Sequence, residues 1–228
     1  MSTDAATTSA ATLISDRINA LEAPQTIEMA KKARALAAQG VDVISLSFGE
    51  PDFQTPQYIK DAAKQAIDEG FTFYTPVPGI PELRQAICDK FKRDNNLDYK
   101  PENIVVGTGA KQALANAVLA LVNPGDEVII FSPFWVSYEE MVKLAEGVTI
   151  RLEGELSNDY KATAAQLEAA ITPRTKLLMY SSPCNPTGAV WSKEEVAAIA
   201  EVVARHPQLV VVADEIYEYI NFVGEHVS

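Results

Sequence analysis

The stretch IVVGTGAKQALANAVLALVNPGDEVIIF, residues 104–131, decides the fold class. It opens with the apolar run Ile104–Val106, typical of a short strand, and passes through a glycine turn into the helical pattern Ala110–Val122. The turn Asn123–Asp126 then leads to a second apolar strand, Glu127–Phe131. A strand, a helix and a second strand in this order are the repeating unit of a mostly parallel sheet, so the sequence predicts an α/β fold.

The same alternation runs from about Thr55 to near Tyr219, and one helix and one strand are also predicted before it. Helical patterns are predicted at Glu28–Gln39, between Thr55-Pro56 and Gly70, at Pro81–Asn95, Tyr138–Ala145 and Ala164–Ile171, and from a capping box at Ser192 and Glu195 to Arg205. Strands are predicted at Val41–Phe48, Val148–Leu152, Lys176–Ser181 and Leu209–Ala213. The last of these is continuously apolar, which is typical of a strand at the centre of a parallel sheet.

Two parts of the chain differ in this pattern. Residues 1–53 show no β–α–β rhythm, and we expect them to form an N-terminal arm and part of a smaller lobe. Residues 54–228 are expected to form the large domain. The last predicted strand lies close to the C-terminus, and the tail Gly224–Ser228 has no pattern typical of the end of a finished domain. We therefore expect the large domain to continue beyond Ser228.

Composition excludes several classes of function. The chain has 228 residues, 47% of them hydrophobic, and a net charge of −12, which disfavours binding to nucleic acid or to an anionic membrane. No apolar run reaches the length of a membrane span, and the segment Met1–Thr12 lacks the features of a secretory signal. The two cysteines, Cys88 and Cys184, indicate no disulfide framework, and a reducing, cytoplasmic compartment is expected.

Four polar or aromatic clusters follow predicted strands, where open α/β sheets place their ligands. They are Gly107–Gln112, Ser132–Trp135, Ser182–Gly188 and Val212–Tyr217. The first can bind an anion at a helix start, the second offers an aromatic face, the third holds an amide in a rigid loop, and the fourth places a carboxylate at the sheet edge.

Each cluster also has a purely structural interpretation. The glycines can make a plain tight turn, Trp135 can be a core residue, Asn185 can cap its own loop, and Asp214 can cap a helix. His206 and His226 have no ligand pattern and are expected at the surface, and no metal is expected. Cys184 is expected to be a buried loop residue and not a nucleophile, because a nucleophile would need a base and no histidine lies near it in sequence.

Six motifs in order carry a resemblance. They are Ser47–Phe53, Tyr74–Arg84, Gly109–Gln112, Pro133–Trp135, Asn185–Gly188 and Asp214–Tyr217. Together they resemble the N-terminal part of the fold-type I pyridoxal-phosphate (PLP) enzymes, close to the class I and II aminotransferases of the aspartate aminotransferase type. The resemblance runs from about Glu28 to Phe222.

The resemblance implies a PLP cofactor and assigns residues to it. Asp214 would pair with the pyridine nitrogen, while Tyr217 and Asn185 would bond the phenolic oxygen of the ring. Trp135 would stack on the ring, and the backbone of Gly109, Ala110 and Lys111 would receive the phosphate, with the Lys111 side chain not required.

The resemblance also implies substrates and a partner. Gly49 would lie where the substrate carboxylate docks, beside Trp135 and Asn185. Tyr74 would reach the cofactor phosphate of a neighbouring subunit, which implies a homodimer with shared active sites. The reaction would move an amino group between an amino acid, aspartate or a related one, and a 2-oxo acid by a ping-pong mechanism.

One departure from the family pattern stands out. Family members carry the Schiff-base lysine after the Asp-x-x-Tyr motif and a substrate-binding arginine later still, but the last lysine here is Lys193. We therefore expect this chain alone to be inactive. A β-lyase or a cyclopropane-forming synthase of the same fold, or a non-catalytic truncated chain, remain as alternatives.

Overall fold

The computed structural model describes residues 13–22, 25–46, 49–224 and 226–228. The chain forms two compact units. We call Met1–Glu22 with Gly107–Ser228 the sheet unit, and Ala23–Val106 the helical unit. This division differs from the expected lobe boundary between residues 53 and 54, which stays a prediction.

The sheet unit contains a four-stranded parallel sheet in the order β2-β1-β3-β4. Its strands are β1 (Glu127–Ser132), β2 (Val148–Glu153), β3 (Thr175–Ser181) and β4 (Val210–Asp214), each close to its predicted range. The α/β prediction is confirmed. The expectation that Leu209–Ala213 lies at the sheet centre is wrong for the described chain, because β4 pairs with β3 alone and its residues alternate in exposure.

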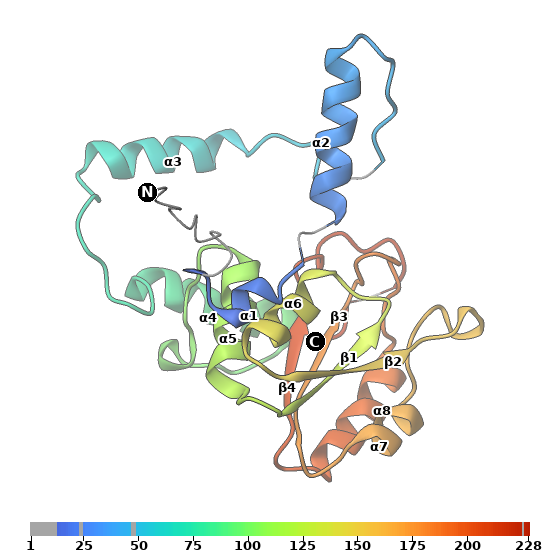
Figure 1. Ribbon diagram of the computed structural model, residues 1–228. Coiled ribbons are helices and arrows are strands. Elements are labelled where there is room, and N and C mark those ends of the chain that lie inside the picture. The colour runs from blue at the N-terminus through green and yellow to red at the C-terminus, as the bar shows by residue number, and fades with distance from the viewer. Residues whose placement is uncertain (1–12, 23–24, 47–48, 225) are drawn as a thin grey trace, which may run out of the picture. The chain divides into compact units, whose positions relative to one another are not determined.

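Helices cover both faces of this sheet (Figure 1). The helices α5 (Ala110–Leu121) and α6 (Ser137–Leu144) pack on one face, and α7 (Ala164–Ala170) and α8 (Lys193–Ala204) on the other. All six residues of β1 are buried, since alternate side chains point to opposite faces and both faces are covered. Each fully buried Ile or Leu contributes about 1.5–3 kcal/mol relative to an exposed one.

Shorter elements complete the sheet unit. The helix α1 (Asp16–Asn19) contacts α6, and a 3₁₀ turn spans Leu156–Asn158. The predicted capping box of Ser192 and Glu195 at the start of α8 is confirmed, with the Glu195 backbone N–H donating to the Ser192 hydroxyl over 3.2 Å.

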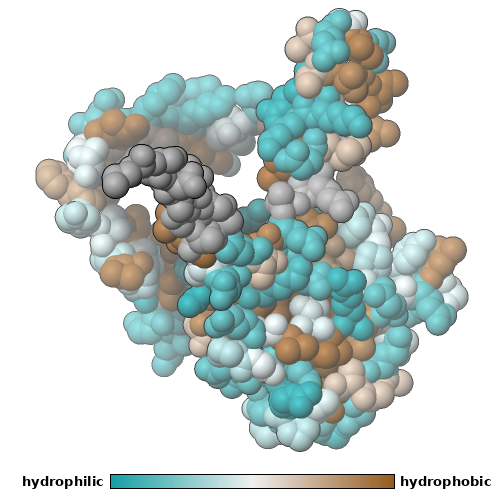
Figure 2. Space-filling model, viewed as in Figure 1, coloured by the Kyte–Doolittle hydropathy of each residue, from teal (hydrophilic) through white to brown (hydrophobic). Residues whose placement is uncertain are grey.

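The helical unit consists of α2 (Gln25–Ala38), α3 (Gln57–Asp68), α4 (Pro81–Asn95) and a 3₁₀ turn at Pro101–Asn103. The helix predictions are confirmed within a few residues. Many apolar side chains of this unit are exposed, and Figure 2 shows apolar surface on α2. None of the residues of α3 is buried.

Two strands predicted in this unit are not formed. Ile104–Val106 and Val41–Leu46 have no strand assignment, and Ser47 and Phe48 lie outside the described residues. A strand requires a neighbouring strand for its hydrogen bonds, and no described strand pairs with either segment. The Val106 N–H instead donates to the Pro78 carbonyl over 3.0 Å.

Within the described ranges no helix is long and apolar enough to cross a membrane. The same ranges contain no cluster of three or more His, Cys, Asp or Glu side chains arranged to hold a metal ion.

Candidate functional site

The polar clusters predicted from the sequence meet at one edge of the sheet. Parallel strands end together, and Ser181 at the end of β3 is in register with Asp214 at the end of β4. The Ser182 N–H donates to the Asp214 carbonyl over 3.1 Å, and the Cys184 thiol lies 3.4 Å from the Pro133 carbonyl oxygen. The loops that follow β1, β3 and β4 are therefore in contact.

The Asp214 carboxylate is held by two donors. Its Oδ2 accepts a hydrogen bond from the Tyr138 hydroxyl at 2.7 Å, and its Oδ1 accepts one from the Ile216 N–H at 3.2 Å. The second bond caps a turn, not the helix that the structural interpretation required. Burial, reinforced by the neighbouring carboxylate, raises the pKa of Tyr138. Sequence reasoning missed Tyr138, which lies 76 residues from Asp214.

Trp135 connects this carboxylate to the start of α5. Its ring meets the Tyr138 ring edge-on, with the centroids 5.7 Å apart. The Lys111 ammonium lies 4.8 Å from the Trp135 ring centroid, within the range of a cation–π contact. Trp135 is partly buried against the core on the α5/α6 face, so the core interpretation is correct for part of its surface.

The start of α5 has the features of an anion site. Gly109 precedes the helix with φ +85°, and a Cβ added there would meet nothing within 4 Å. The first backbone bond into the helix comes from Ala113 to the Gly109 carbonyl, so the N–H groups of Ala110, Lys111 and Gln112 have no partner within the helix. These donors and the helix dipole favour a bound anion.

The loop Ser182–Gly188 is closed by backbone bonds near Asn185. The Cys184 N–H donates to the Ala189 carbonyl at 2.9 Å, and the Gly188 N–H donates to the Cys184 carbonyl at 2.7 Å. Over the part of the chain that the structure describes, the Asn185 amide itself makes no hydrogen bond. The interpretation of Asn185 as a cap of its own loop therefore has no support, and its amide is available to a ligand.

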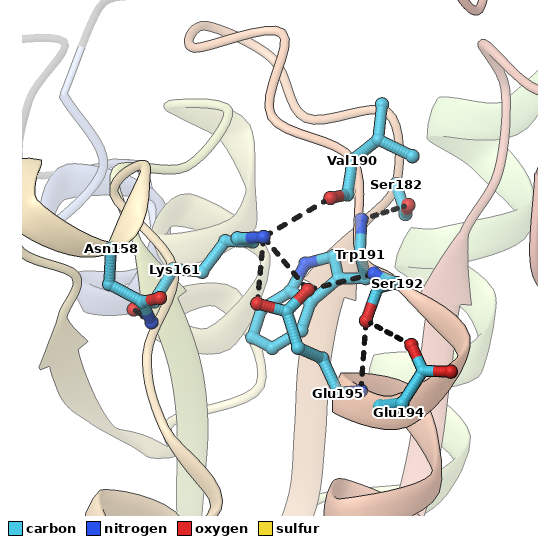
Figure 3. Close-up of polar contacts among 8 residues, drawn as sticks. All are labelled: Asn158, Lys161, Ser182, Val190, Trp191, Ser192, Glu194 and Glu195. Carbon is cyan, nitrogen blue, oxygen red and sulfur yellow. Dashed lines mark hydrogen bonds and ion pairs between the residues drawn. The ribbon is translucent and has the colours of Figure 1, made fainter. Parts of the chain in front are cut away.

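A second network anchors the segment that follows this loop (Figure 3). Lys161 forms an ion pair of 2.7 Å with Glu195, and its ammonium also lies 3.4 Å from the Val190 carbonyl oxygen. The Trp191 N–H donates to the Ser182 hydroxyl at 3.3 Å. Burial alone would raise the pKa of Glu195, but the bonds from Lys161 and from the backbone of Ser192 outweigh it and lower that pKa.

The remaining candidate residues fall into two groups. Tyr217 lies three residues beyond β4, is partly buried, and its hydroxyl has no hydrogen-bond partner within the described ranges. Tyr74 and Gly49 belong to the helical unit, where both are exposed. Their roles at a shared site therefore stay predictions.

The histidines and cysteines differ in part from expectation. His206 bonds Glu168 at 3.1 Å near the surface, but the His226 side chain is only 10% exposed and lies 3.6 Å from Glu215. The surface expectation for His226 is wrong, because the end of the described chain folds back onto Glu215, where the Ser228 hydroxyl also donates. Cys88 is buried and Cys184 is half-buried, and both are free thiols.

Comparison with known proteins identifies relatives. The family model "Aminotransferase class I and II" matches residues 41–226. The chain is 54% identical over 209 residues to the aspartate/prephenate aminotransferase of Cereibacter sphaeroides, covering 92% of this chain and 52% of that protein. It is 49% identical to the aspartate aminotransferase of Bacillus sp. strain YM-2, covering 95% of this chain and 55% of that protein.

A solved structure gives the same result. The aspartate aminotransferase of Thermus thermophilus with maleate superposes with a TM-score of 0.91 at 46% identity, covering 94% of this chain and 56% of that one. The chain thus spans about half the length of the curated relatives that it matches.

Proposed function

This chain belongs to the family of class I and II aminotransferases, whose cofactor is PLP, and we propose that it forms the cofactor-binding half of a longer transaminase. That enzyme, called the complete polypeptide below, moves an amino group between an amino acid and a 2-oxo acid. The observation that carries the proposal is the Asp214 carboxylate, fixed at the carboxyl edge of the sheet beside the loop that holds Asn185.

The residues at this edge fit PLP. The start of α5 offers unpaired N–H groups to a phosphate, and Gly109 leaves open space there. Asn185 and Tyr217 offer free hydrogen-bonding groups to a phenolic oxygen, and Trp135 offers an aromatic ring. Bound PLP supplies an electron sink for the amino acid's Cα, and the protein's part is to orient and charge it.

Asp214 has the central electrostatic task. An ionised carboxylate next to a pyridine nitrogen favours the protonated ring, because the two opposite charges stabilise each other. The two donors that hold Asp214 reduce the reorganisation needed when charge develops. Asn185 and Tyr217 would act at the opposite side of the ring, where hydrogen bonds to the phenolic oxygen tune its basicity.

Substrate preference is proposed from the relatives. Their names specify aspartate and prephenate, so an aspartate-like amino donor is the first to test. Gly49, Trp135 and Asn185 are proposed to contact the substrate. The two free cysteines are consistent with a cytoplasmic site of action.

The test of Asp214 uses the complete polypeptide. Asp214→Asn keeps the shape and removes the charge, so the turnover of aspartate with 2-oxoglutarate should fall by about two to three orders of magnitude. Asp159→Asn, in an exposed turn, is the matched control and should leave turnover unchanged. Near-normal turnover of Asp214→Asn would show that the carboxylate is structural.

The chain of 228 residues should show no transamination on its own, because no lysine follows Lys193. Glutamate formation is measured with PLP, aspartate and 2-oxoglutarate. Turnover that depends on this chain would overturn the expectation.

The complete polypeptide distinguishes the alternative functions. If it binds PLP but eliminates or cyclises its substrate, the β-lyase or the synthase alternative is correct. If it binds no PLP, the non-catalytic alternative is correct.

We also propose a homodimer in which Tyr74 reaches the partner's cofactor phosphate. Tyr74 is fully exposed within its own unit, in a segment where Pro76 and Pro78 favour an extended path. Tyr74→Phe removes one charge-assisted hydrogen bond, worth about 1.5–3 kcal/mol, and should weaken PLP retention without dissociating the dimer. At a PLP concentration too low to load Tyr74→Phe, subunit exchange between this variant and Asp214→Asn should restore part of the activity, since one site of each mixed dimer is then intact.

If exchange is verified and no activity returns, Tyr74 does not act across the interface. A sedimentation measurement that finds only monomers of the complete polypeptide would contradict the dimer itself.

A further inference from the structure

We infer that Tyr138 is a positioning residue for Asp214: its buried hydroxyl fixes the carboxylate and keeps a shared proton on the cofactor nitrogen. The inference rests on the proposed function, because it assumes that Asp214 faces a pyridine nitrogen. It adds a residue that none of the recognised motifs contains.

The Tyr138 ring is locked in the core. It is 1% exposed and lies in α6, with its centroid 6.4 Å from that of Phe134 and 5.7 Å from that of Trp135. The Phe134 ring is nearly parallel to it, and the Trp135 ring is perpendicular to it. The hydroxyl therefore cannot leave Asp214 by a rotation of the side chain without opening the α5/α6 face of the core.

The direction of the hydrogen bond follows from the chemistry of the two groups. An ionised carboxylate can only accept, so the Tyr138 hydroxyl donates over its 2.7 Å contact. Burial and the adjacent Asp214 raise the pKa of Tyr138, so the phenol keeps its proton at working pH. Tyr138 is thus a permanent donor.

A permanent donor has two effects on the carboxylate. With the Ile216 N–H on the other oxygen, it fixes the plane of Asp214 from two separate elements, α6 and the loop after β4. It also keeps the hydroxyl hydrogen against the carboxylate, which opposes transfer of the ring proton to that group. A proton shared between Asp214 and a pyridine nitrogen then stays on the nitrogen, where it makes the ring a better electron sink.

The test compares Tyr138→Phe with wild type in the complete polypeptide loaded with PLP labelled with ¹⁵N in the ring. The ring ¹⁵N signal should move toward that of neutral pyridine, and kcat should fall about tenfold with KM nearly unchanged, as expected for one hydrogen bond to a charged group. Tyr180→Phe is the matched control, since Tyr180 is a half-buried tyrosine of β3 that packs on Phe131 and Trp191. It should change neither quantity.

A double-mutant cycle separates positioning from packing. In the Asp214→Asn background, Tyr138→Phe should have little further effect, whereas a packing role would cost the same in both backgrounds. If Tyr138→Phe does not fold, 3-fluorotyrosine at this position keeps the ring and makes a stronger donor. The ¹⁵N signal should then move toward the protonated form.

An unchanged ¹⁵N signal in Tyr138→Phe, together with kcat within about twofold of wild type, would overturn this inference but not the proposed function. The 3-fluorotyrosine protein is measured at a pH at which the wild-type ring is only partly protonated, and an unchanged ¹⁵N signal there would also overturn the inference. A wild-type complete polypeptide that binds no PLP would overturn the proposed function, and this inference with it.

Discussion

The sheet unit has a buried core on both faces of its sheet, whereas most large apolar side chains of the helical unit are exposed. In the sheet unit, Ile129 and Leu178 are fully buried between two helical layers. In the helical unit, Ile67 is 66% exposed, although it lies in the amphipathic pattern of α3. The difference teaches that a good amphipathic pattern needs a partner surface, which the sheet unit contains within itself.

The largest expected difference between the units is in hydrogen exchange. Backbone amides of β1 and β3 exchange only when the core opens, whereas α3 has no buried residue to keep it closed. We expect amides of β1 to exchange about a thousandfold or more slowly than those of α3 in this chain. Mass spectrometry of exchanged peptides measures this directly. Equal protection would mean that α3 acquires a partner in solution, and the comparison would fail.

A matched pair of isoleucines sharpens the comparison. Ile129→Ala in β1 removes a side chain with no exposed surface and should lower the free energy of unfolding by about 2–5 kcal/mol. Ile67→Ala in α3 should change it by less than about 0.5 kcal/mol. Urea unfolding followed by circular dichroism measures both. A large effect at Ile67 would show that the helical unit buries this face in solution.

A pair of glycines tests whether the helical unit has tightly packed points of its own. Gly79 has φ +106°, and an added Cβ would lie 2.6 Å from the Val106 side chain, whereas Gly70 has φ +80° with nothing within 4 Å. Both Gly→Ala changes strain the backbone, but Gly79→Ala should cost about 1–3 kcal/mol more. Thermal melts of the two variants provide the comparison. Equal losses would mean that the contact between Gly79 and Val106 is loose.

The smallest expected effect concerns a carboxylate at the amino ends of the strands, opposite to the edge that holds Asp214. Glu127 is 3% exposed, and bonds from Thr172 and then Arg174 hold its pKa below the usual value. A lowered pKa in the folded state gives stability that is present above the unfolded pKa and lost as pH falls through the folded one. The difference in free energy of unfolding between wild type and Glu127→Gln should therefore be largest at neutral pH and shrink below about pH 4.

Denaturant midpoints at a series of pH values measure that difference, with the exposed Glu102→Gln as control. A difference that does not depend on pH would assign the role of Glu127 to shape and not to charge.

The sheet unit could be predicted from the sequence because its signals are local. Apolar runs bounded by turns predicted β1, β2 and β3 within one or two residues. The failures at Ile104–Val106 and Val41–Leu46 have a common physical cause. A strand needs a neighbouring strand, and a short segment rich in apolar residues does not specify whether that neighbour exists.

The candidate site shows the same limit. The loops with Asn185 and Asp214 were predicted, because each follows an apolar strand pattern that ends in polar or turn-forming residues. The role of Tyr138 was not predicted, because its hydrogen bond to Asp214 joins positions 76 residues apart. From the sequence alone, its position in α6 indicates only a buried core residue. His226 was placed wrongly for a similar reason, because its burial depends on how the last described residues fold back.

Successive buried residues of β1 and β3 point to opposite faces of the sheet, and this has a consequence for the register of the strands. Odd and even positions of each strand belong to different hydrophobic clusters, so a slip of one residue would exchange the two clusters' side chains. Such a slip would also move a strand end by about 3.3 Å and turn its side chain to the opposite face. The packing of the two clusters, away from Asp214 itself, therefore helps to fix the register of the strands and with it the position of their carboxyl ends.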